Sequence, residues 1–314
     1  MSALRLGTRR SALALAQARA VAAALLRHGH AVEMVEVVTE GDRSGAPLTQ
    51  IGGTGVFVTA LRDALLEGRV DLAVHSMKDL PTAPLDGVAL GAVPVREDPR
   101  DVLVHPGGLG LVELPRGTRV GTGSPRRAAQ LLALGYGLEP VAIRGNVGTR
   151  LQKAADGEVD AVVLARAGLA RLGRLDVVTE VIDPLQVLPA PAQGALAIEV
   201  RSDAPAVAAA VAVLDDPDSR AATIAERALL AALGAGCLAP VGALAEVADD
   251  GDGGAELFLR AVIAASDGSQ TLRRSASGPA RDPEAVGRAL ATELLDDGAA
   301  ELAAVGPLSR TGPS

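Results

Sequence analysis

Two adjacent residues of opposite charge, Lys78 and Asp79, follow an apolar segment at residues 70–74 and offer acid–base chemistry. A carboxylate at the end of a strand can stabilise a cationic intermediate or move a proton. Lysine is rare here, because only Lys78 and Lys153 occur among the 30 basic residues. Lys78 is therefore a second candidate. The structural alternative is that Asp79 caps the turn before Pro81.

Cys237 is the only cysteine of the chain and a candidate nucleophile. It follows Gly234-Ala235-Gly236 after a strongly helical segment, so we expect it in an exposed loop. A thiol near arginines has a lowered pKa and reacts more readily. The alternative is a small buried hydrophobic side chain. A single cysteine forms no internal disulfide, which suits a reducing compartment.

Residues 122–127 have the features of an anion site at the start of a helix. Ser124 can cap the helix and Pro125 suits its first position, which leaves free N–H groups directed outward. Arg126 and Arg127 add two planar groups suited to carboxylate or phosphate. The alternative is an exposed basic first turn. Because such cations oppose the helix dipole, a bound anion would relieve the conflict.

More arginines extend this candidate site. Arg144 and Arg150 bracket Gly145-Asn146-Val147-Gly148, whose glycines allow close backbone approach. In a protein of net charge −8, a cluster of arginines predicts a ligand with several carboxylates or phosphates. The arginines expected in this cationic cleft are Arg9, Arg126, Arg127, Arg144, Arg150 and Arg171.

Strands and helices must alternate to bring these segments together. Valine-rich runs between alanine-rich helical stretches predict an α/β protein with a largely parallel sheet. Ligands of such sheets bind beyond the carboxyl ends of strands, where the polar clusters 8–11, 75–79, 122–127 and 144–150 fall. The expected strands are 4–7, 31–38, 70–74, 88–93, 119–121, 141–143, 161–164 and 195–200. The expected helices are 11–27, with Ser11 as N-cap, 56–67, 219–233 and 283–295.

The length of 314 residues predicts two or three domains. A proline-rich stretch at residues 183–193 resembles a hinge, after which the strand at 195–200 can return to the first unit. We expect a discontinuous first domain of residues 1–95 plus 195–213, a second domain of residues 100–189 and a small α+β third domain of residues 217–310.

Composition excludes several classes of function. The acidic balance argues against broad nucleic-acid binding. No run of about 18 apolar residues occurs, and the N-terminus has no apolar signal core, so we expect a cytoplasmic protein that is not inserted in a membrane. No cluster has metal-ligand spacing, so no metal is expected.

The chain resembles the porphobilinogen deaminases, also called hydroxymethylbilane synthases. The resemblance runs in order from about Leu4 to about Leu295. Its most specific patterns are His75-Ser76-Met77-Lys78-Asp79-Leu80-Pro81 and Arg144-Gly145-Asn146-Val147-Gly148-Thr149-Arg150. The other matching segments are 7–14, 52–57, 96–101, 122–127, 193–195 and 236–237.

This resemblance implies a fold and a reaction. The family has three domains, of which the first two resemble the halves of a type II periplasmic binding protein and the small third carries the cofactor cysteine. It implies a transferase of porphyrin biosynthesis, commonly monomeric, that condenses four molecules of porphobilinogen, with loss of ammonia, into hydroxymethylbilane. The growing tetrapyrrole extends a dipyrromethane cofactor, which the apoenzyme builds from substrate and holds through a thioether to Cys237.

The resemblance also implies roles for single residues. Asp79 and Lys78 match the catalytic positions, with the Asp79 carboxylate near pyrrole N–H groups and the developing cation. Each pyrrole carries an acetate and a propionate, which agrees with a cationic cleft. The residues matched to cofactor binding are Cys237, Ser76, Lys78, Thr122, Ser124, Arg126, Arg127, Arg144 and Arg150. Those matched to substrate binding are Arg9, Ser11, Arg144, Arg171, Gln193 and Gly194.

Three positions depart from the family pattern. Thr54 stands where several members have lysine, and Gly123 replaces a serine that many have. Pro191-Ala192 precedes Gln193 in place of a more usual glycine, which stiffens the hinge. These departures concern substrate handling and domain motion.

Two other functions fit parts of the sequence. A non-catalytic anion-binding module of the two-domain solute-binding type would use the arginines and the hinge, but it has no use for Cys237 or a third domain. A cysteine-dependent transferase acting on a phosphorylated or acylated substrate would need a histidine base. The four histidines, His28, His30, His75 and His105, all lie far from Cys237 in sequence.

Overall fold

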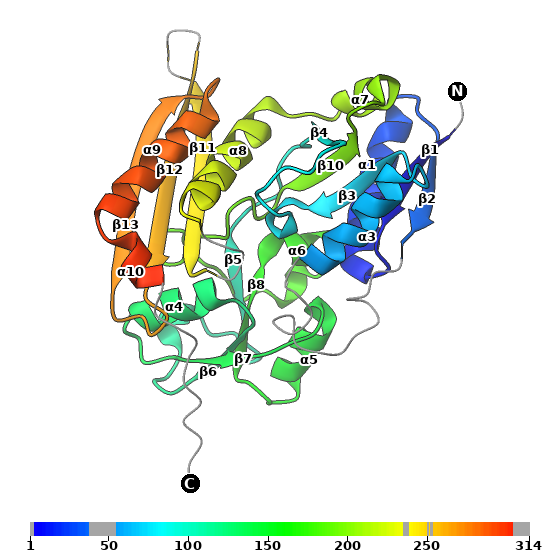
Figure 1. Cartoon of the computed structure of the whole chain (residues 1–314). Coiled ribbons are helices and arrows are strands. Elements are labelled where there is room, and N and C mark those ends of the chain that lie inside the picture. The colour runs from blue at the N-terminus through cyan, green and yellow to red at the C-terminus, as the bar shows by residue number, and fades with distance from the viewer. Residues whose placement is uncertain (1–2, 38–54, 235–238, 250, 252–253, 304–314) are drawn as a thin grey trace.

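The computed structural model describes residues 3–37, 55–234, 239–249, 251 and 254–303. Thr54, Cys237 and the tail after Gly306, which we expected to be frayed, lie outside these residues. The described chain forms three sheets, each with its own helices (Figure 1). The expected α/β class is confirmed.

The first sheet has the strand order β2-β1-β3-β10-β4. β1 (Leu4–Thr8) pairs in parallel with β2 (Val32–Glu36) and β3 (Leu72–Ser76). β10 (Leu196–Arg201) lies antiparallel between β3 and β4 (Val88–Ala92). Because the second sheet separates β4 from β10 in sequence, the chain leaves the first sheet and returns to it.

Helices cover both faces of the first sheet. α1 (Ala12–Arg27) and α7 (Pro205–Ala212) pack on one face, and α3 (Gly55–Leu66) packs on the other. Ser11 caps α1, since its Oγ accepts a hydrogen bond from the Ala14 N–H at 3.2 Å, as its sequence predicts. The candidate residues Thr8–Ser11 therefore lie where β1 ends and α1 begins.

The second sheet has the order β7-β6-β8-β5-β9. β6 (Arg119–Thr122) is parallel to β7 (Glu139–Ala142) and β8 (Ala161–Ala165). β5 (Asp101–Val104) is antiparallel to β8 and to β9 (Glu180–Val181). The arrangement repeats that of the first sheet, because one antiparallel strand lies between the third strand and the edge strand: β10 in the first sheet and β5 in the second.

One helix covers one face of the second sheet and two cover the other. α4 (Pro125–Ala133) packs on one face, and α5 (Val147–Ala155) and α6 (Arg166–Arg171) pack on the opposite face. The short turns η2 (Leu111–Glu113) and η3 (Leu175–Val177) complete this unit.

The expectation of a largely parallel sheet is wrong. In each of the first two sheets, two strand pairings are parallel and two are antiparallel. The antiparallel members are β5, which we did not predict as a strand, and β10. Both strands directly follow the segments that cross between the sheets. Their direction is therefore set by the crossing, whereas a right-handed βαβ connection would have made them parallel to their neighbours.

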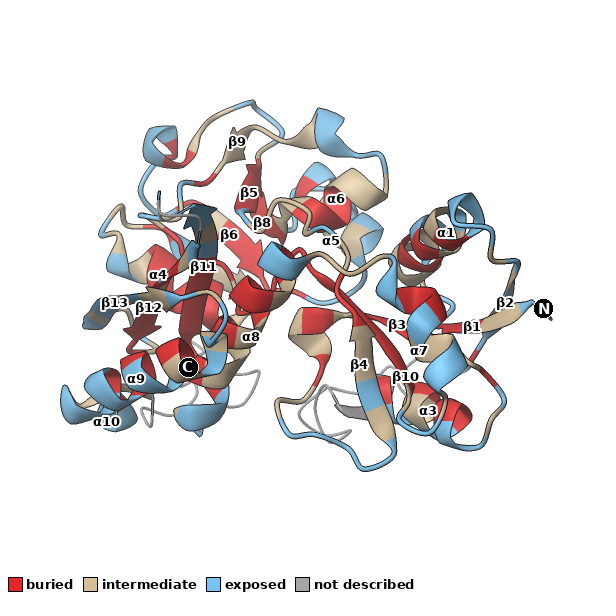
Figure 2. Cartoon of the chain, turned by 90° about the horizontal axis from the view of Figure 1, so that it is seen from above, coloured by how far each residue is buried: buried red, intermediate tan, exposed pale blue. Residues whose placement is uncertain are grey.

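The third sheet is an antiparallel meander of β11 (Val241–Asp249), β12 (Ala255–Ala264) and β13 (Thr271–Pro279). Alternate apolar residues of these strands face α8 (Pro217–Ala232) and α9 (Pro283–Asp296), while α10 (Ala299–Ala303) follows α9. Figure 2 shows the exposed outer surfaces of α9 and α10; β11 and β12 carry buried residues, whereas β13 carries none. The expected small α+β unit is confirmed.

The division into domains of residues 1–95 plus 195–213, 100–189 and 217–310 stays a prediction. Within the described residues, no helix is both long enough and apolar enough to cross a bilayer.

Candidate active site

Two crossing segments join the first and second sheets and lie against each other. Gly194 has φ +92°, and a Cβ atom on it would lie 2.2 Å from the Glu97 carbonyl oxygen, so only glycine permits this approach. The Glu97 N–H donates to the Gly194 carbonyl at 3.3 Å, and the Arg171 guanidinium of α6 donates to the same carbonyl. Two predicted substrate-binding residues, Arg171 and Gly194, are thus bonded together at the crossing.

Gln193 uses every hydrogen-bonding position of its side-chain amide. Its Nε2 donates to the Pro99 carbonyl and to Asp101 Oδ1, both at 2.7 Å. Its Oε1 accepts from Lys78 Nζ at 3.1 Å and from Arg127 Nη2 at 3.4 Å. An amide has two donors and two acceptor lone pairs, so this buried side chain is saturated. Gln193 therefore links Lys78 of the first sheet unit to Asp101 and Arg127 of the second.

Asp101, the first residue of β5, is the buried anion of the cluster. Its side chain is fully buried, and its oxygens accept from Arg126 Nη2 at 2.8 Å and Arg127 Nη2 at 2.7 Å. Burial alone would raise the pKa of Asp101, but Arg126, Arg127 and Gln193 outweigh burial and hold it well below its usual range. We gave Asp101 no role from the sequence, although an acidic residue that opens an apolar strand was a usable signal.

Arg126 and Arg127 lie in the first turn of α4, as predicted, but this turn is not an exposed basic one. Ser124 caps the helix by accepting from the Arg127 N–H, and Pro125 is its first residue. The two guanidinium groups point inward, with exposed fractions of 3% and 5%, and share Asp101. Each Nε atom lacks a hydrogen-bond partner among the described residues. Two cations sharing one anion leave this pair with a net positive charge.

Lys78 and Asp79 leave the carboxyl end of β3 in the short turn η1 (Met77–Asp79). Burial lowers the pKa of Lys78 to about 8, even though Asp79 opposes the shift, and Arg127 lowers it further. The Asp79 carboxylate has no hydrogen bond to another residue in the described part of the chain, so the turn-capping alternative finds no support. Lys78 thus lies near Arg126 and Arg127 of the second sheet unit, and Asp79 is the next residue of the same turn.

Arg144 and Arg150 flank the start of α5. Asn146 caps this helix by accepting from the Thr149 N–H at 2.9 Å, and Arg150 Nε donates to the Gly145 carbonyl at 2.9 Å. Burial lowers the pKa of Arg150, and Arg127 and Arg144 lower it further. Cations that destabilise one another's charge mark a place where an anionic ligand is favourable.

The starts of α1 and α5 meet at α6. A Cβ atom on Gly168 would lie 3.8 Å from a Leu13 methyl group and 3.9 Å from one of Val147. The clusters 8–11 and 144–150, at the starts of these two helices, therefore lie near each other beside α6. Arg9 is half-buried and Arg144 is exposed.

The remaining predicted site residues fall at strand ends. Ser76 is the last residue of β3, and Thr122 is the last of β6, where its Oγ1 accepts from the Ser124 N–H at 3.2 Å. Cys237 lies outside the described residues. Of the predicted set, Lys78, Arg126, Arg127 and Gln193 come together in one bonded cluster, while Ser11 and Ser124 act as helix caps.

Two of the family departures have local consequences. A Cβ atom on Gly123 would lie 2.8 Å from the Ile143 carbonyl oxygen, so a serine here would force a shift. Ala192 has φ +60°, the only positive φ of a non-glycine residue in the described chain. This conformation favours glycine, the more usual residue at that position.

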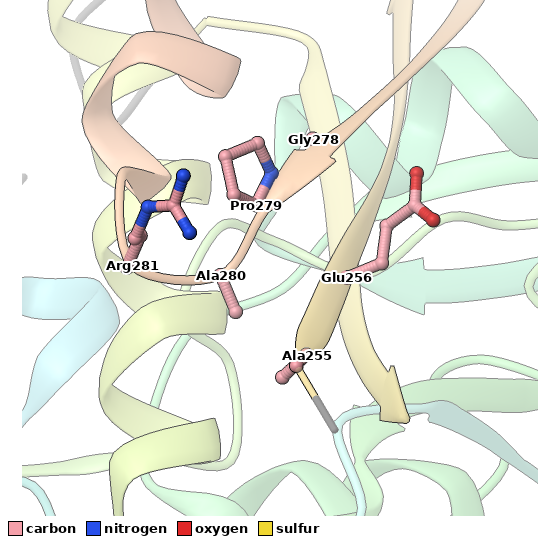
Figure 3. A pocket seen from close by; sticks show the side chains of 7 residues that line it. Ala255, Glu256, Gly278, Pro279, Ala280 and Arg281 are labelled. Carbon is pink, nitrogen blue, oxygen red and sulfur yellow. The ribbon is translucent and has the colours of Figure 1, made fainter. Parts of the chain in front are cut away.

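A separate hollow opens in the third sheet unit, between the ends of β12 and β13 (Figure 3). Its lining is mostly backbone and small side chains, and Glu256 and Arg281 lie on opposite sides of it. No group of His, Cys, Asp and Glu among the described residues is arranged to hold a metal ion. The bonded cluster at the crossing therefore remains the candidate active site.

Solved structures of solute-binding proteins are similar to part of the chain. The methionine binding protein MetQ is 12% identical with a TM-score of 0.43, covering 67% of this chain and 89% of its own. A nutrient binding protein from Burkholderia cenocepacia bound to methionine is 13% identical with a TM-score of 0.40, covering 66% and 90%.

Family models and curated relatives cover nearly the whole chain. The model described as porphobilinogen deaminase, dipyromethane cofactor binding domain, matches residues 4–209, and its C-terminal domain model matches residues 221–296. The porphobilinogen deaminase of Nocardia farcinica is 56% identical over 98% of this chain and 91% of its own length. Porphobilinogen deaminase 1 of Streptomyces avermitilis is 58% identical over 96% and 97%. With its cation-rich cluster between two sheet units, the chain belongs to the porphobilinogen deaminase family.

Proposed function

We propose that this protein is a transferase of tetrapyrrole biosynthesis that condenses four molecules of porphobilinogen, with loss of ammonia, into hydroxymethylbilane. A dipyrromethane cofactor attached to Cys237 primes the reaction. The family model over residues 4–209, named for dipyromethane cofactor binding, and the relatives named porphobilinogen deaminase support this proposal.

One observation carries the proposal: the unbalanced cations where the first two sheet units meet. Lys78 comes from the first unit, and Arg126, Arg127 and Arg150 come from the second. The pKa values of Lys78 and Arg150 are lowered by burial and then by neighbouring cations. Asp101 is the anion that Arg126 and Arg127 share. A ligand with several carboxylates would balance the remaining charge, and every pyrrole of the proposed substrate carries two.

The same residues fit a dipyrromethane. The unpartnered Nε atoms of Arg126 and Arg127 are buried donors, which cost free energy until an acceptor reaches them. The free pyrrole α-position that the bound cofactor supplies is the point where substrate is added. The residues proposed to hold its carboxylates and pyrroles are Ser76, Lys78, Thr122, Ser124, Arg126, Arg127, Arg144 and Arg150, beside Cys237.

Asp79 is proposed to act on the reacting pyrrole. Loss of ammonia from porphobilinogen leaves positive charge on the ring, and a fixed carboxylate beside the ring N–H stabilises that charge. The Asp79 carboxylate is available, since no hydrogen bond to a described residue occupies it. Lys78 beside it can bind a substrate carboxylate. The residues proposed to bind substrate are Arg9, Ser11, Arg144, Arg171, Gln193 and Gly194.

We also propose that the protein is a cytoplasmic monomer without a nucleic-acid or membrane partner. The acidic net charge of −8 supports the first exclusion. The shared family supports porphobilinogen as the small-molecule partner.

The test is the intact mass of the purified protein beside its Cys237→Ala variant. We expect the native chain to carry an excess mass of two linked pyrrole units, and the variant to carry none. A native mass equal to the bare sequence would be followed by incubation with porphobilinogen. An apoenzyme gains the mass and then releases hydroxymethylbilane, whereas a non-catalytic anion-binding module gains nothing, and that result would refute the proposal.

A further inference from the structure

Arg227 of α8 holds the backbone on both sides of Asp79. Its Nη1 donates to the Leu80 carbonyl at 2.9 Å and to the Met77 carbonyl at 3.3 Å, and its Nη2 donates to the Pro81 carbonyl at 2.6 Å. One of these carbonyls precedes Lys78 in sequence and two follow Asp79. A single guanidinium from the third sheet unit therefore bonds to a loop of the first.

The loop from Met77 to Pro81 has few bonds of its own. η1 is one short turn, closed by a hydrogen bond of 3.2 Å from the Leu80 N–H to the Met77 carbonyl. Carbonyls at the end of such a turn lack partners within it, and Pro81 has no N–H to donate. A cation is the favoured donor for a group of carbonyls at a helical C-terminus. Arg227 supplies that donor.

Apolar packing beside Arg227 is incomplete. A cavity there is lined by Met77, Thr82, Ile224, Arg227 and Arg288, and it lies between the Asp79 loop and the helices α8 and α9. The facing surfaces are therefore not fully in contact. Met77 and Leu80 are buried in the core of the first sheet unit, so the hydrogen bonds of Arg227 act on the side of the loop that faces α8.

The residue before Arg227 fixes α8 in turn. Glu226 is fully buried and accepts from Arg96 Nη1 at 2.7 Å, from Arg96 Nη2 at 3.0 Å and from the Ala245 N–H at 2.7 Å. Arg96 lies on the first crossing segment, so α8 is anchored to the crossing by Glu226 and to the Asp79 loop by Arg227. α8 ends at Ala232, shortly before Cys237 in sequence.

We propose that Arg227 is a positioning residue for the transferase reaction. It fixes the loop that carries Asp79 on α8, which Glu226 in turn anchors to the crossing, so that the loop keeps one position relative to both. The inference rests on the proposed function. Arginine is required because its planar fork reaches three carbonyls from two nitrogens, whereas the ammonium of lysine is a single point charge.

Arg220 offers a matched control on the same helix. Its Nε donates to Asp215 Oδ2 at 2.7 Å, and its Nη2 donates to the Gly91 carbonyl at 3.3 Å. It thus also ties α8 to the first sheet unit, but at the edge strand β4 and away from the Asp79 loop. A purely structural role for Arg227 would make the two arginines equivalent in their effect on turnover.

The experiment compares Arg227→Met and Arg220→Met, each in the wild-type and Asp79→Glu backgrounds, by urea midpoint, intact mass, kcat and KM for porphobilinogen. We expect Arg227→Met to lower kcat at least about tenfold with KM changed less than about threefold, because ground-state binding is retained. In the Asp79→Glu background the further loss should shrink below about threefold, since both changes misplace the same carboxylate. Arg220→Met should change kcat by less than about twofold in the wild-type background.

The outcomes separate the inference from the proposed function. A wild-type protein with neither cofactor mass nor turnover contradicts the function itself. If the wild type is active and Arg227→Met and Arg220→Met lower its kcat equally, the positioning role is refuted. It is also refuted if the fold-loss in kcat of the Arg227→Met/Asp79→Glu double variant equals the product of the two single losses. If Arg227→Met does not fold, Arg227→Lys replaces it with the same expected split between kcat and KM. If Asp79→Glu has no measurable turnover, the comparison of the two single variants decides.

Discussion

Replacing Asp101 by asparagine removes the negative charge that Arg126 and Arg127 share, at nearly constant shape. The aspartate accepts three hydrogen bonds of 2.7 to 2.8 Å, from Arg126, Arg127 and Gln193. Asparagine keeps one acceptor oxygen, but its amide NH₂ takes the place of the other oxygen. That NH₂ group then faces an N–H donor of a neighbouring side chain and cannot bond to it. Two buried guanidinium groups then repel each other without an anion between them.

The free energy of unfolding should fall by about 3–5 kcal/mol, the usual effect of removing one partner from a buried ion pair. Asp101 is fully buried and its partners nearly so, so water does not screen the loss. A domain is typically stable by only about 5–15 kcal/mol, which makes this a large share. Gln193 would lose its bond to Asp101, and its link to Lys78 would loosen as a result.

The assay is urea denaturation followed by circular dichroism, with Asp203→Asn as the matched control. Asp203 pairs with Arg201 at 2.9 Å, but its side chain is 79% exposed, so its loss should leave the midpoint nearly unchanged. The pKa of Asp101 in the folded protein lies well below its pKa in the unfolded chain. Its contribution to the free energy of unfolding is therefore complete above the unfolded pKa and is lost as the pH falls below it. The gap between wild type and Asp101→Asn should therefore narrow below about pH 4.

Equal midpoints for wild type and Asp101→Asn at neutral pH would refute this reasoning. So would a gap that widens in acid, because a carboxylate with a lowered pKa stabilises the protein only while it is ionised.

Two further predictions concern the crossing and Lys78. Gly194→Ala should lower the free energy of unfolding by at least about 3 kcal/mol, because its Cβ would lie 2.2 Å from the Glu97 carbonyl oxygen. Ala192→Gly should change the free energy of unfolding by less than about 1 kcal/mol, because relief of the left-handed conformation at φ +60° offsets the loss of a buried methyl group. Similar urea midpoints for Gly194→Ala and Ala192→Gly would contradict this expectation. Because burial lowers the pKa of Lys78 to about 8, the unfolded chain binds the proton more tightly, and stability should rise between about pH 8 and pH 10. Urea midpoints across this range should show that Lys78→Met lacks the rise, and an equal rise in both proteins would show that Lys78 is not its source.

The sequence predicts the elements better than their directions. Periodicity and caps place α1, α3, α8 and α9 within two residues of their observed ends, because these amphipathic helices are locally encoded. The direction of β5 and β10 depends on segments that cross between the sheets. The proline-rich stretch predicts that the chain returns to the first unit, but no local pattern encodes the direction in which β5 and β10 then run, so the mixed sheets were not predicted.

Site residues show the same division. The spacing at residues 122–127 predicts a capped helix start with two arginines, and the structure confirms the cap. It does not predict that both arginines turn inward, because their partner Asp101 is more than twenty positions away in sequence. Arg227 was missed for a similar reason, since its acceptors are backbone carbonyls, which leave no trace in residue type.

The bonds of Gln193 suggest how ligand binding and the crossing are linked. Three of its four partners, Pro99, Asp101 and Arg127, lie on the crossing segment or in the second sheet unit, and only Lys78 belongs to the first. Separation of the two units would therefore break the bond to Lys78 first. An anionic ligand that accepts from Lys78 Nζ in place of the Gln193 amide oxygen forms a charge-assisted hydrogen bond, which is stronger than the bond to a neutral amide. The positions of the two units and the occupancy of the cationic cluster are consequently coupled through one lysine.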